Sequence, residues 1–299
     1  MTDVHSPTGI VPNMVTPMRD DGHPDPEGIQ KLVDFLIGKK VGGIWVLGSA
    51  GEDVHISQDD RVTVANETAK AADNRVPILV GLGTAPFFDI LRFVERTDHD
   101  RISAYHFLPY DLKIGDAGLI RYVTKLADRL PVPLWLYHNP KRGRPITLGV
   151  AEALRDHPNV AGIKVGGYSL TELTSMMMLR QNGFEVSGAG SGQLFQLLSL
   201  GARLHMTSDA NCWPEVFIEL KRLFDAGERD AALALQYRII LLNRSLPRND
   251  NGEYAAEEKF ILSLRGICGE AVNPAYRRLS EDEKDRVRKA LREFGFEWV

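Results

Sequence analysis

The sequence predicts an α/β protein, and within that class a (β/α)8 TIM barrel followed by a C-terminal helical appendage. Short apolar runs rich in β-branched and aromatic residues recur along the chain, and a stretch with helical spacing of apolar residues follows each run. Strict alternation of strands and helices predicts parallel strands joined by right-handed crossovers. Eight such units in about 200 residues suit a closed barrel, which has no exposed sheet edge.

The predicted strands are residues 11–18, 42–48, 77–83, 102–109, 133–139, 160–165, 184–188 and 203–208. An open, doubly wound sheet is the alternative architecture. Such a sheet usually carries a glycine-rich phosphate turn after its first strand, and the segment 13–17 contains no glycine. The barrel is therefore the favoured architecture.

The intervening helices are indicated by apolar stripes and by their starting residues. Leu119, Val123 and Leu126 form one stripe at three- and four-residue spacing. Asp25 precedes a proline suited to a first helical turn, and Ser57 precedes two acids, so both are predicted N-caps.

Further helices are predicted at 214–226, 229–245, 255–266 and 279–294. The first completes the barrel, and the other three form the appendage. The segment 246–252 is the one loop rich in turn formers, and it separates two of these helices. We therefore expect a catalytic barrel over 1–227 and a helical extension over 228–299.

The 299-residue chain has a formal net charge of −4 with interspersed signs, which argues against a nucleic-acid-binding face. Its first twelve residues lack the pattern of a secretory signal, and no apolar run reaches the length of a membrane span. Cys212 and Cys268 are too few and too far apart for a disulfide framework or a zinc site. These features predict a soluble, cytoplasmic protein with neither a membrane nor a nucleic-acid partner.

Lys164 is the first candidate for chemistry, because it interrupts an otherwise apolar predicted strand. Reactive groups in barrels of this kind lie at the C-terminal ends of the strands. Burial favours the neutral amine, which is the form that attacks a carbonyl carbon. The alternative is a lysine that reaches out of the barrel rim or pairs with a buried acid.

Two neighbouring strand ends offer further candidates. Tyr137 is expected to point away from the helices if Leu136 points towards them, and its phenol could then carry protons during imine formation. A tyrosine packed with its hydroxyl bonded elsewhere is the other reading. The turn 48–52 has two glycines around small residues, so its backbone N–H groups could converge on a carboxylate, although many strand–helix turns look similar.

The predicted strands also contain His106, His138 and His205. A divalent-metal barrel would need several histidines and carboxylates at adjacent strand ends, and no His-x-His or His-Glu-x-x-His motif occurs. We expect packing or solvated histidines, with no metal and no organic cofactor.

Taken as an ordered set, these segments resemble the dihydrodipicolinate synthase/N-acetylneuraminate lyase family. The resemblance covers nearly the whole chain, and no single motif in it is decisive. It is carried by the segments 48–52, 137–142, 162–164, 186–188, 207–211 with Pro214, and 273–280.

The resemblance implies a Schiff base between Lys164 and pyruvate or another 2-oxo acid. Tyr137 would transfer protons and be held by the Ser49 hydroxyl, and the backbone N–H groups of Ser49 and Ala50 would bind the substrate carboxylate. The protonated imine would stabilise the enamine formed when the neighbouring bond breaks. Gly188 would be a further substrate-binding position, and the family suggests a homo-oligomer, either a dimer or a tetramer.

Two positions depart from the family pattern. Ala50 stands where a second hydroxyl residue is usual, so one side-chain contact of roughly 1.5–3 kcal/mol is lost. Asp111 stands where the synthases and sialic acid lyases have a tyrosine that reaches the neighbouring subunit's site. That relay is broken unless Asp111 or Tyr110 replaces it.

Arg142 lies five residues beyond the strand-five tyrosine, where the synthases bind the acceptor's carboxylate. A distal acid on the substrate is therefore one expectation, and an arginine that bridges loops is the other interpretation. An aromatic aldehyde is a second possible partner for the 2-oxo acid. The segment 188–191 lacks the acidic side chains that sialic acid lyases use for sugar hydroxyls, which disfavours a polyhydroxylated sugar acid.

The function expected from these features is a class I (lysine Schiff base) lyase or aldolase. A 2-oxo-acid dehydratase or an atypical 4-hydroxy-tetrahydrodipicolinate synthase is the alternative within the same chemistry. A keto-acid-binding homologue without turnover is the alternative outside it.

Overall fold

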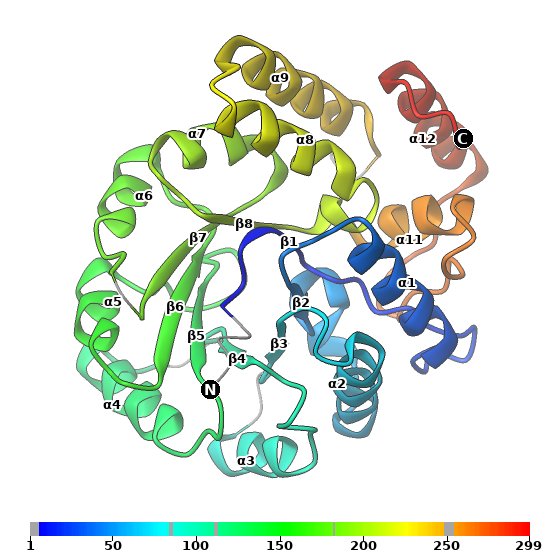
Figure 1. Ribbon diagram of the computed structural model, residues 1–299. Coiled ribbons are helices and arrows are strands. Elements are labelled where there is room, and N and C mark those ends of the chain that lie inside the picture. The colour runs from blue at the N-terminus through cyan, green and yellow to red at the C-terminus, as the bar shows by residue number, and fades with distance from the viewer. Residues whose placement is uncertain (1–5, 84–85, 111–112, 182, 248–253) are drawn as a thin grey trace.

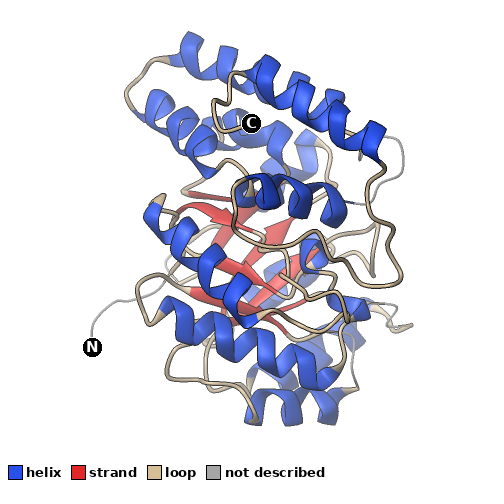
Figure 2. Cartoon of the chain, turned by 90° about the vertical axis from the view of Figure 1, so that its right-hand side faces the viewer, coloured by secondary structure: helices blue, strands red, loops and turns tan. Residues whose placement is uncertain are grey.

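The computed structural model describes residues 6–83, 86–110, 113–181, 183–247 and 254–299. Within them, eight strands form one ring in the middle of the molecule, surrounded by helices (Figures 1 and 2). The strands are β1 (Gly9–Pro12), β2 (Ile44–Val46), β3 (Ile78–Gly81), β4 (Ala104–Phe107), β5 (Leu134–His138), β6 (Val160–Val165), β7 (Glu185–Ala189) and β8 (Leu204–Thr207).

All hydrogen-bonded strand pairs are parallel, and the order runs from β1 through β8 back to β2. The two ends of this order meet at an isolated parallel bridge between Asn13 and Trp45. There the backbone N–H of Met14 donates to the main-chain oxygen of Trp45 at 2.8 Å. The sheet is therefore a nearly closed (β/α)8 barrel, as the sequence predicted.

The first strand was predicted at the wrong place. Residues 11–18 were expected, whereas β1 is Gly9–Pro12. Met14 and Val15 are apolar because they are buried in the layer between sheet and helices, although they lie beyond the strand. Burial alone produced the strand-like pattern, and Pro17 has no N–H with which to extend the sheet.

The barrel helices are α1 (Pro26–Gly38), α2 (Gln58–Ala72), α3 (Phe87–Glu95), α4 (Asp116–Ala127), α5 (Leu148–Arg155), α6 (Leu170–Met177), α7 (Leu194–Ser199) and α8 (Pro214–Asp225). Asp25 occupies the N-cap position of α1, but its side chain makes no capping bond. Ser57 caps α2 by accepting a hydrogen bond from the Asp60 backbone N–H at 3.2 Å. None of the helices in the described part of the chain is long and apolar enough to cross a membrane.

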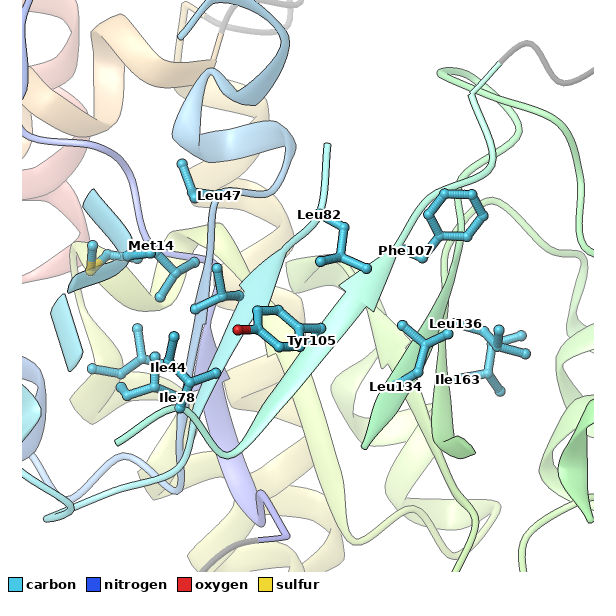
Figure 3. Packing of buried hydrophobic residues seen from close by; sticks show 14 of the residues in the cluster. Met14, Ile44, Leu47, Ile78, Leu82, Tyr105, Phe107, Leu134, Leu136 and Ile163 are labelled. Carbon is cyan, nitrogen blue, oxygen red and sulfur yellow. The ribbon is translucent and has the colours of Figure 1, made fainter. Parts of the chain in front are cut away.

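Alternating side chains on the strands divide the core into two layers. Leu134, Leu136 and Ile163 point outwards and pack against the helices (Figure 3). Trp45, Leu79, Trp135 and Met206 belong instead to the cluster inside the ring. Tyr137 and Lys164, the next residues after Leu136 and Ile163 on their strands, therefore face the barrel interior.

The appended helices are α9 (Arg229–Ser245), α11 (Tyr254–Leu264) and α12 (Glu281–Phe294). Side chains from α8, α9, α11 and α12 share one apolar cluster that includes Phe217, Ile239, Phe260 and Val287. In Figure 1, α11 lies between the barrel and α12. The cluster runs across the boundary expected at residue 227, so the extension is packed onto the barrel.

Candidate active site

Lys164 lies on β6 and points into the barrel, where only 2% of its surface is exposed. Its Nζ donates a hydrogen bond to Oδ1 of Asn13 at 3.0 Å. The same nitrogen lies 4.3 Å from the ring centroid of Tyr137 and 4.7 Å from that of Trp45. The amine is thus enclosed by two aromatic rings and one neutral amide, and no carboxylate in the described part of the chain forms an ion pair with it.

Burial lowers the pKa of Lys164 to about 7, against the opposing attraction of the Asp53 carboxylate. Desolvation penalises the ammonium because the site offers little polar solvation in place of water. At neutral pH a large fraction of the side chain is therefore the neutral, nucleophilic amine.

Tyr137 pairs directly with Lys164 in the register of β5 and β6. Its hydroxyl lies 3.3 Å from Oγ of Ser49 and accepts a hydrogen bond from the Asn139 side-chain amide at 3.2 Å. Burial raises the pKa of the phenol, so it keeps its proton at neutral pH. The phenol is thus held as a proton donor beside the amine.

The turn after β2 forms the next part of the site. Residues Ser49–Gly51 make a short 3-10 turn, and its Ser49 and Ala50 lie at the cavity wall. Gly48 precedes them where a Cβ atom would lie 2.8 Å from Nε1 of Trp45, so only glycine lets the turn pass that ring.

These groups surround a cavity of about 320 Å³ at the C-terminal ends of the strands. Its lining joins residues that follow β1 and β2, residues at or beyond the ends of β5 to β8, and one residue of α9. They are Asn13, Ser49, Ala50, Tyr137, Asn139, Lys164, Gly190, Ser191, Thr207, Ser208, Asp209 and Asn243.

Two predicted site residues are not on that wall. A Cβ atom on Gly188 would meet the Leu197 side chain at 2.1 Å, so this position faces the helix layer. Arg142 donates from Nη2 to Oδ1 of Asp53 at 3.1 Å and lies near the Tyr110 ring. The substrate-binding roles of both residues stay predictions.

Asp53 was not predicted from the sequence, which pointed only to Ser49 and Ala50 in the strand-two turn. Its carboxylate accepts hydrogen bonds from Arg142 and from the Tyr110 hydroxyl, while its main-chain oxygen accepts from Arg61 at 2.8 Å. The signal available in the sequence was the pair of acids, Glu52 and Asp53, directly after the glycine-containing turn. Asp111, the other acid considered for the relay, lies outside the described residues.

Asn13, Asn139 and Asn243 were also missed. Asn13 and Asn139 are polar residues at strand ends, which is a usable signal in a barrel. Asn243 comes from α9, and only the tertiary structure brings it to the cavity, where it donates to the Ser191 hydroxyl at 2.5 Å.

The three strand histidines are packed side chains. His106 stacks on Trp45 at 3.7 Å, and His138 stacks on Tyr168 at 3.8 Å. His205 bonds through Nε2 to the main-chain oxygen of Gly190 at 2.8 Å. Within the described residues, no group of three or more His, Cys, Asp or Glu side chains could hold a metal ion.

A sequence model of the Dihydrodipicolinate synthetase family matches residues 6–294. One relative is the 4-hydroxy-tetrahydrodipicolinate synthase of Methanosphaerula palustris, 28% identical over 94% of this chain and 96% of that protein. Another is the "Putative 2-dehydro-3-deoxy-D-gluconate aldolase YagE" of Escherichia coli K12, 29% identical with 96% of each chain covered.

Solved structures agree with this relationship. The crystal structure of YagE from Escherichia coli K12 in complex with pyruvate superposes with a TM-score of 0.89 and 26% identity, covering 96% of this chain and 98% of that one. N-acetylneuraminate lyase from Mycoplasma synoviae has the same fold, with a TM-score of 0.85 at 22% identity and coverage of 96% and 97%.

Fold and site therefore define a class I, lysine Schiff-base lyase or aldolase that uses a 2-oxo acid. The chain belongs to the dihydrodipicolinate synthetase family.

Proposed function

We propose that Lys164 forms a Schiff base with pyruvate, or with the pyruvyl end of a longer 2-oxo acid, and that the chain makes or breaks the adjacent C–C bond. One observation carries the proposal: a fully buried amine whose pKa is lowered to about 7 lies against Tyr137 at the wall of a cavity of about 320 Å³. A neutral amine can attack the 2-oxo carbon, and loss of water from the adduct then leaves the imine.

Tyr137 would move the protons in these steps. Loss of the hydroxyl from the adduct needs a proton, and the phenol beside Lys164 can deliver it. In the cleavage direction the protonated imine accepts the electron pair of the C3–C4 bond, the C4 hydroxyl loses its proton, and an aldehyde leaves. The resulting enamine is protonated at C3, and water then releases pyruvate. Ser49 would orient the phenol through its hydroxyl.

The substrate carboxylate would bind to the backbone N–H groups of Ser49 and Ala50. Donors from a short turn concentrate partial positive charge at one point, which suits a carboxylate without a cationic side chain. Because Ala50 provides no hydroxyl, we expect this contact to depend on the backbone of the turn.

The acceptor end of the cavity favours a neutral, hydroxyl-bearing aldehyde. Among the described lining residues, Lys164 is the only cation, whereas Ser191, Ser208, Asp209 and Asn243 contribute hydroxyl, carboxylate and amide groups to the lining. This differs from the sequence-based preference for a second carboxylate, which used Arg142, and from the sequence-based argument against a polyhydroxylated sugar acid, which used the segment 188–191. A carboxylated acceptor, and hence atypical synthase activity, would require Arg142 to exchange its bond with Asp53 for the substrate.

A 2-oxo-acid dehydratase would use the same imine and proton carrier, and a non-catalytic homologue would keep only the binding step. We also expect a homo-oligomer, a dimer or tetramer, working in the cytoplasm. Sedimentation velocity of the purified chain tests the oligomeric state.

Borohydride reduction tests the central step. We expect incubation with pyruvate followed by reduction to add one pyruvate-derived mass to Lys164, located by peptide mapping. Lys164→Met is the matched control and should acquire none. Absence of label on Lys164 in the wild-type chain would refute the proposed function.

A further inference from the structure

The turn after β2 is held from two sides by segments distant in the sequence. On one side, the Thr16 hydroxyl donates to the main-chain oxygen of Gly51 at 2.8 Å. On the other side, the next residue, Glu52, turns its carboxylate towards α11 and the segment that follows it. Figure 1 shows α11 beside the β1–β2 side of the barrel.

Glu52 and Lys259 form an ion pair in which both side chains are completely buried. Nζ of Lys259 donates to Oε1 of Glu52 at 2.5 Å and to the main-chain oxygen of Ala271 at 2.7 Å. The second carboxylate oxygen accepts from the backbone N–H of Asn273 at 2.6 Å. A buried pair is tolerated only when such extra bonds satisfy both charges, so Glu52 has little freedom to move.

The backbone of Glu52 is unusual as well. Its φ is +59°, a left-handed conformation that non-glycine residues seldom adopt. Glu52 connects the 3-10 turn Ser49–Gly51 to the 3-10 turn Asp53–His55. Its conformation therefore sets the direction of both turns, and its bonds to Lys259 and Asn273 hold that conformation.

Asn273 also holds the second turn. Its side-chain amide donates to the main-chain oxygen of His55 at 2.8 Å, and the Tyr276 ring packs edge-on against His55 at 5.2 Å. The C-terminal segment thus contacts both turns through separate groups, while none of Glu52, Lys259 and Asn273 lines the cavity.

We infer that Glu52, Lys259 and Asn273 are positioning residues for the carboxylate end of the 2-oxo acid. They act through the backbone of Ser49 and Ala50 and do not touch the substrate. The inference depends on the proposed function, because it requires that this backbone bind the carboxylate. It gives the C-terminal extension a part in substrate affinity.

The test compares two ketones that form the same imine. Pyruvate carries the carboxylate, and hydroxyacetone does not, so only pyruvate uses the turn. Borohydride trapping on Lys164 is measured against the concentration of each ketone. The main variant is Glu52→Gln combined with Lys259→Met, which removes both buried charges together and leaves neither one unpaired.

We expect the double variant to need about tenfold more pyruvate for half-maximal trapping, the equivalent of one weakened bond to a charged group. Its half-maximal concentration of hydroxyacetone should stay within about twofold of the wild type. Arg265→Met is the matched control. It breaks another ion pair made by the C-terminal segment, with Glu215 on α8, and should change neither value.

Asn273→Ala provides a second, milder variant. It keeps the buried pair and the backbone bond from Asn273 to Glu52, and it removes the side-chain bond to the main-chain oxygen of His55. It should raise the half-maximal pyruvate concentration by a smaller factor and leave that of hydroxyacetone unchanged, and it tests the hold on the second turn if the double variant does not fold. The inference would be overturned if the variants left the half-maximal pyruvate concentration unchanged. It would also be overturned if they raised the half-maximal concentrations of both ketones by the same factor. Failure of the wild-type chain to trap pyruvate would instead overturn the proposed function.

Discussion

The amine of Lys164 lies over the face of the Tyr137 ring, with Nζ 4.3 Å from the ring centroid, while the phenol oxygen is bonded to Ser49 and Asn139. The amine and the phenol are therefore neighbours, but they form hydrogen bonds with different residues. Because the Asn139 amide donates to the phenol oxygen, the proton of Tyr137 remains available to Ser49 or to a substrate. This arrangement would separate the proposed nucleophile, Lys164, from the proposed proton carrier, Tyr137.

The pH dependence of imine formation should reflect the lowered pKa of Lys164. The neutral amine is the reactive form, so the initial rate of trapping at low pyruvate concentration should rise with pH, reach half its maximum near pH 7 and then level off. Asp53→Asn removes a charge that raises this pKa, and should move the midpoint to lower pH. A rate that continues to climb above about pH 9 would show an ordinary lysine.

Replacing Lys164 should make the protein more stable and inactive. Folding lowers the pKa of Lys164 from 10.5 to about 7, so the unfolded chain binds more protons between these values and the free energy of unfolding rises with pH across that window. Lys164→Met removes this linkage. The gain in the free energy of unfolding should be largest below pH 7, on the order of 5 kcal/mol at most, and should shrink towards pH 10.5.

Urea unfolding of Lys164→Met and wild type at pH 6.5 and 9.5 measures this difference. Lys70→Met, at a largely exposed side chain on α2, is the control and should show no such pH dependence. If Lys164→Met raises the free energy of unfolding by the same amount at both pH values, the result would contradict a desolvated amine.

Tyr137→Phe should slow proton transfer while leaving the amine in place. A positioned general acid–base contributes about 10²–10⁴-fold to a rate. The rate at which the pyruvate methyl protons exchange in D2O, followed by NMR, should therefore decrease by a factor in that range. Ser49→Ala loses one neutral hydrogen bond to the phenol and should cost about tenfold or less. Equal losses in the two variants would argue that Tyr137 is not the proton carrier.

The proposal of a neutral, hydroxyl-bearing acceptor predicts that one substitution near the cavity changes the preference among aldehydes and that another does not. Asn243→Ala should lower kcat/KM for glyceraldehyde relative to propanal, because the amide lies at the polar wall. Arg142→Ala should leave the ratio between succinic semialdehyde and butanal unchanged, since Asp53 already binds the guanidinium. Loss of preference for succinic semialdehyde in Arg142→Ala would instead support a carboxylated acceptor.

The sequence was sufficient to predict the architecture and to single out Lys164 and Tyr137, which the structure pairs on neighbouring strands. Alternation of apolar runs and helical stripes is a local property, so eight strand–helix units could be recognised, and β6 begins and ends where predicted. Lys164 and Tyr137 stand out locally as well, because each is a polar side chain in an apolar strand. Their direct pairing follows once the strands are parallel and adjacent.

Tertiary structure alone decided the surroundings of that centre. Lys164 and Asn13 are 151 positions apart, and Glu52 and Lys259 are 207 positions apart, so no local pattern links them. Closing the barrel brings the first and sixth strands together across its interior, and packing of α11 brings a C-terminal lysine beneath the strand-two turn. The sequence determined which side chains could react; long-range packing decided their solvation and their partners, because both depend on what the folded chain places around them.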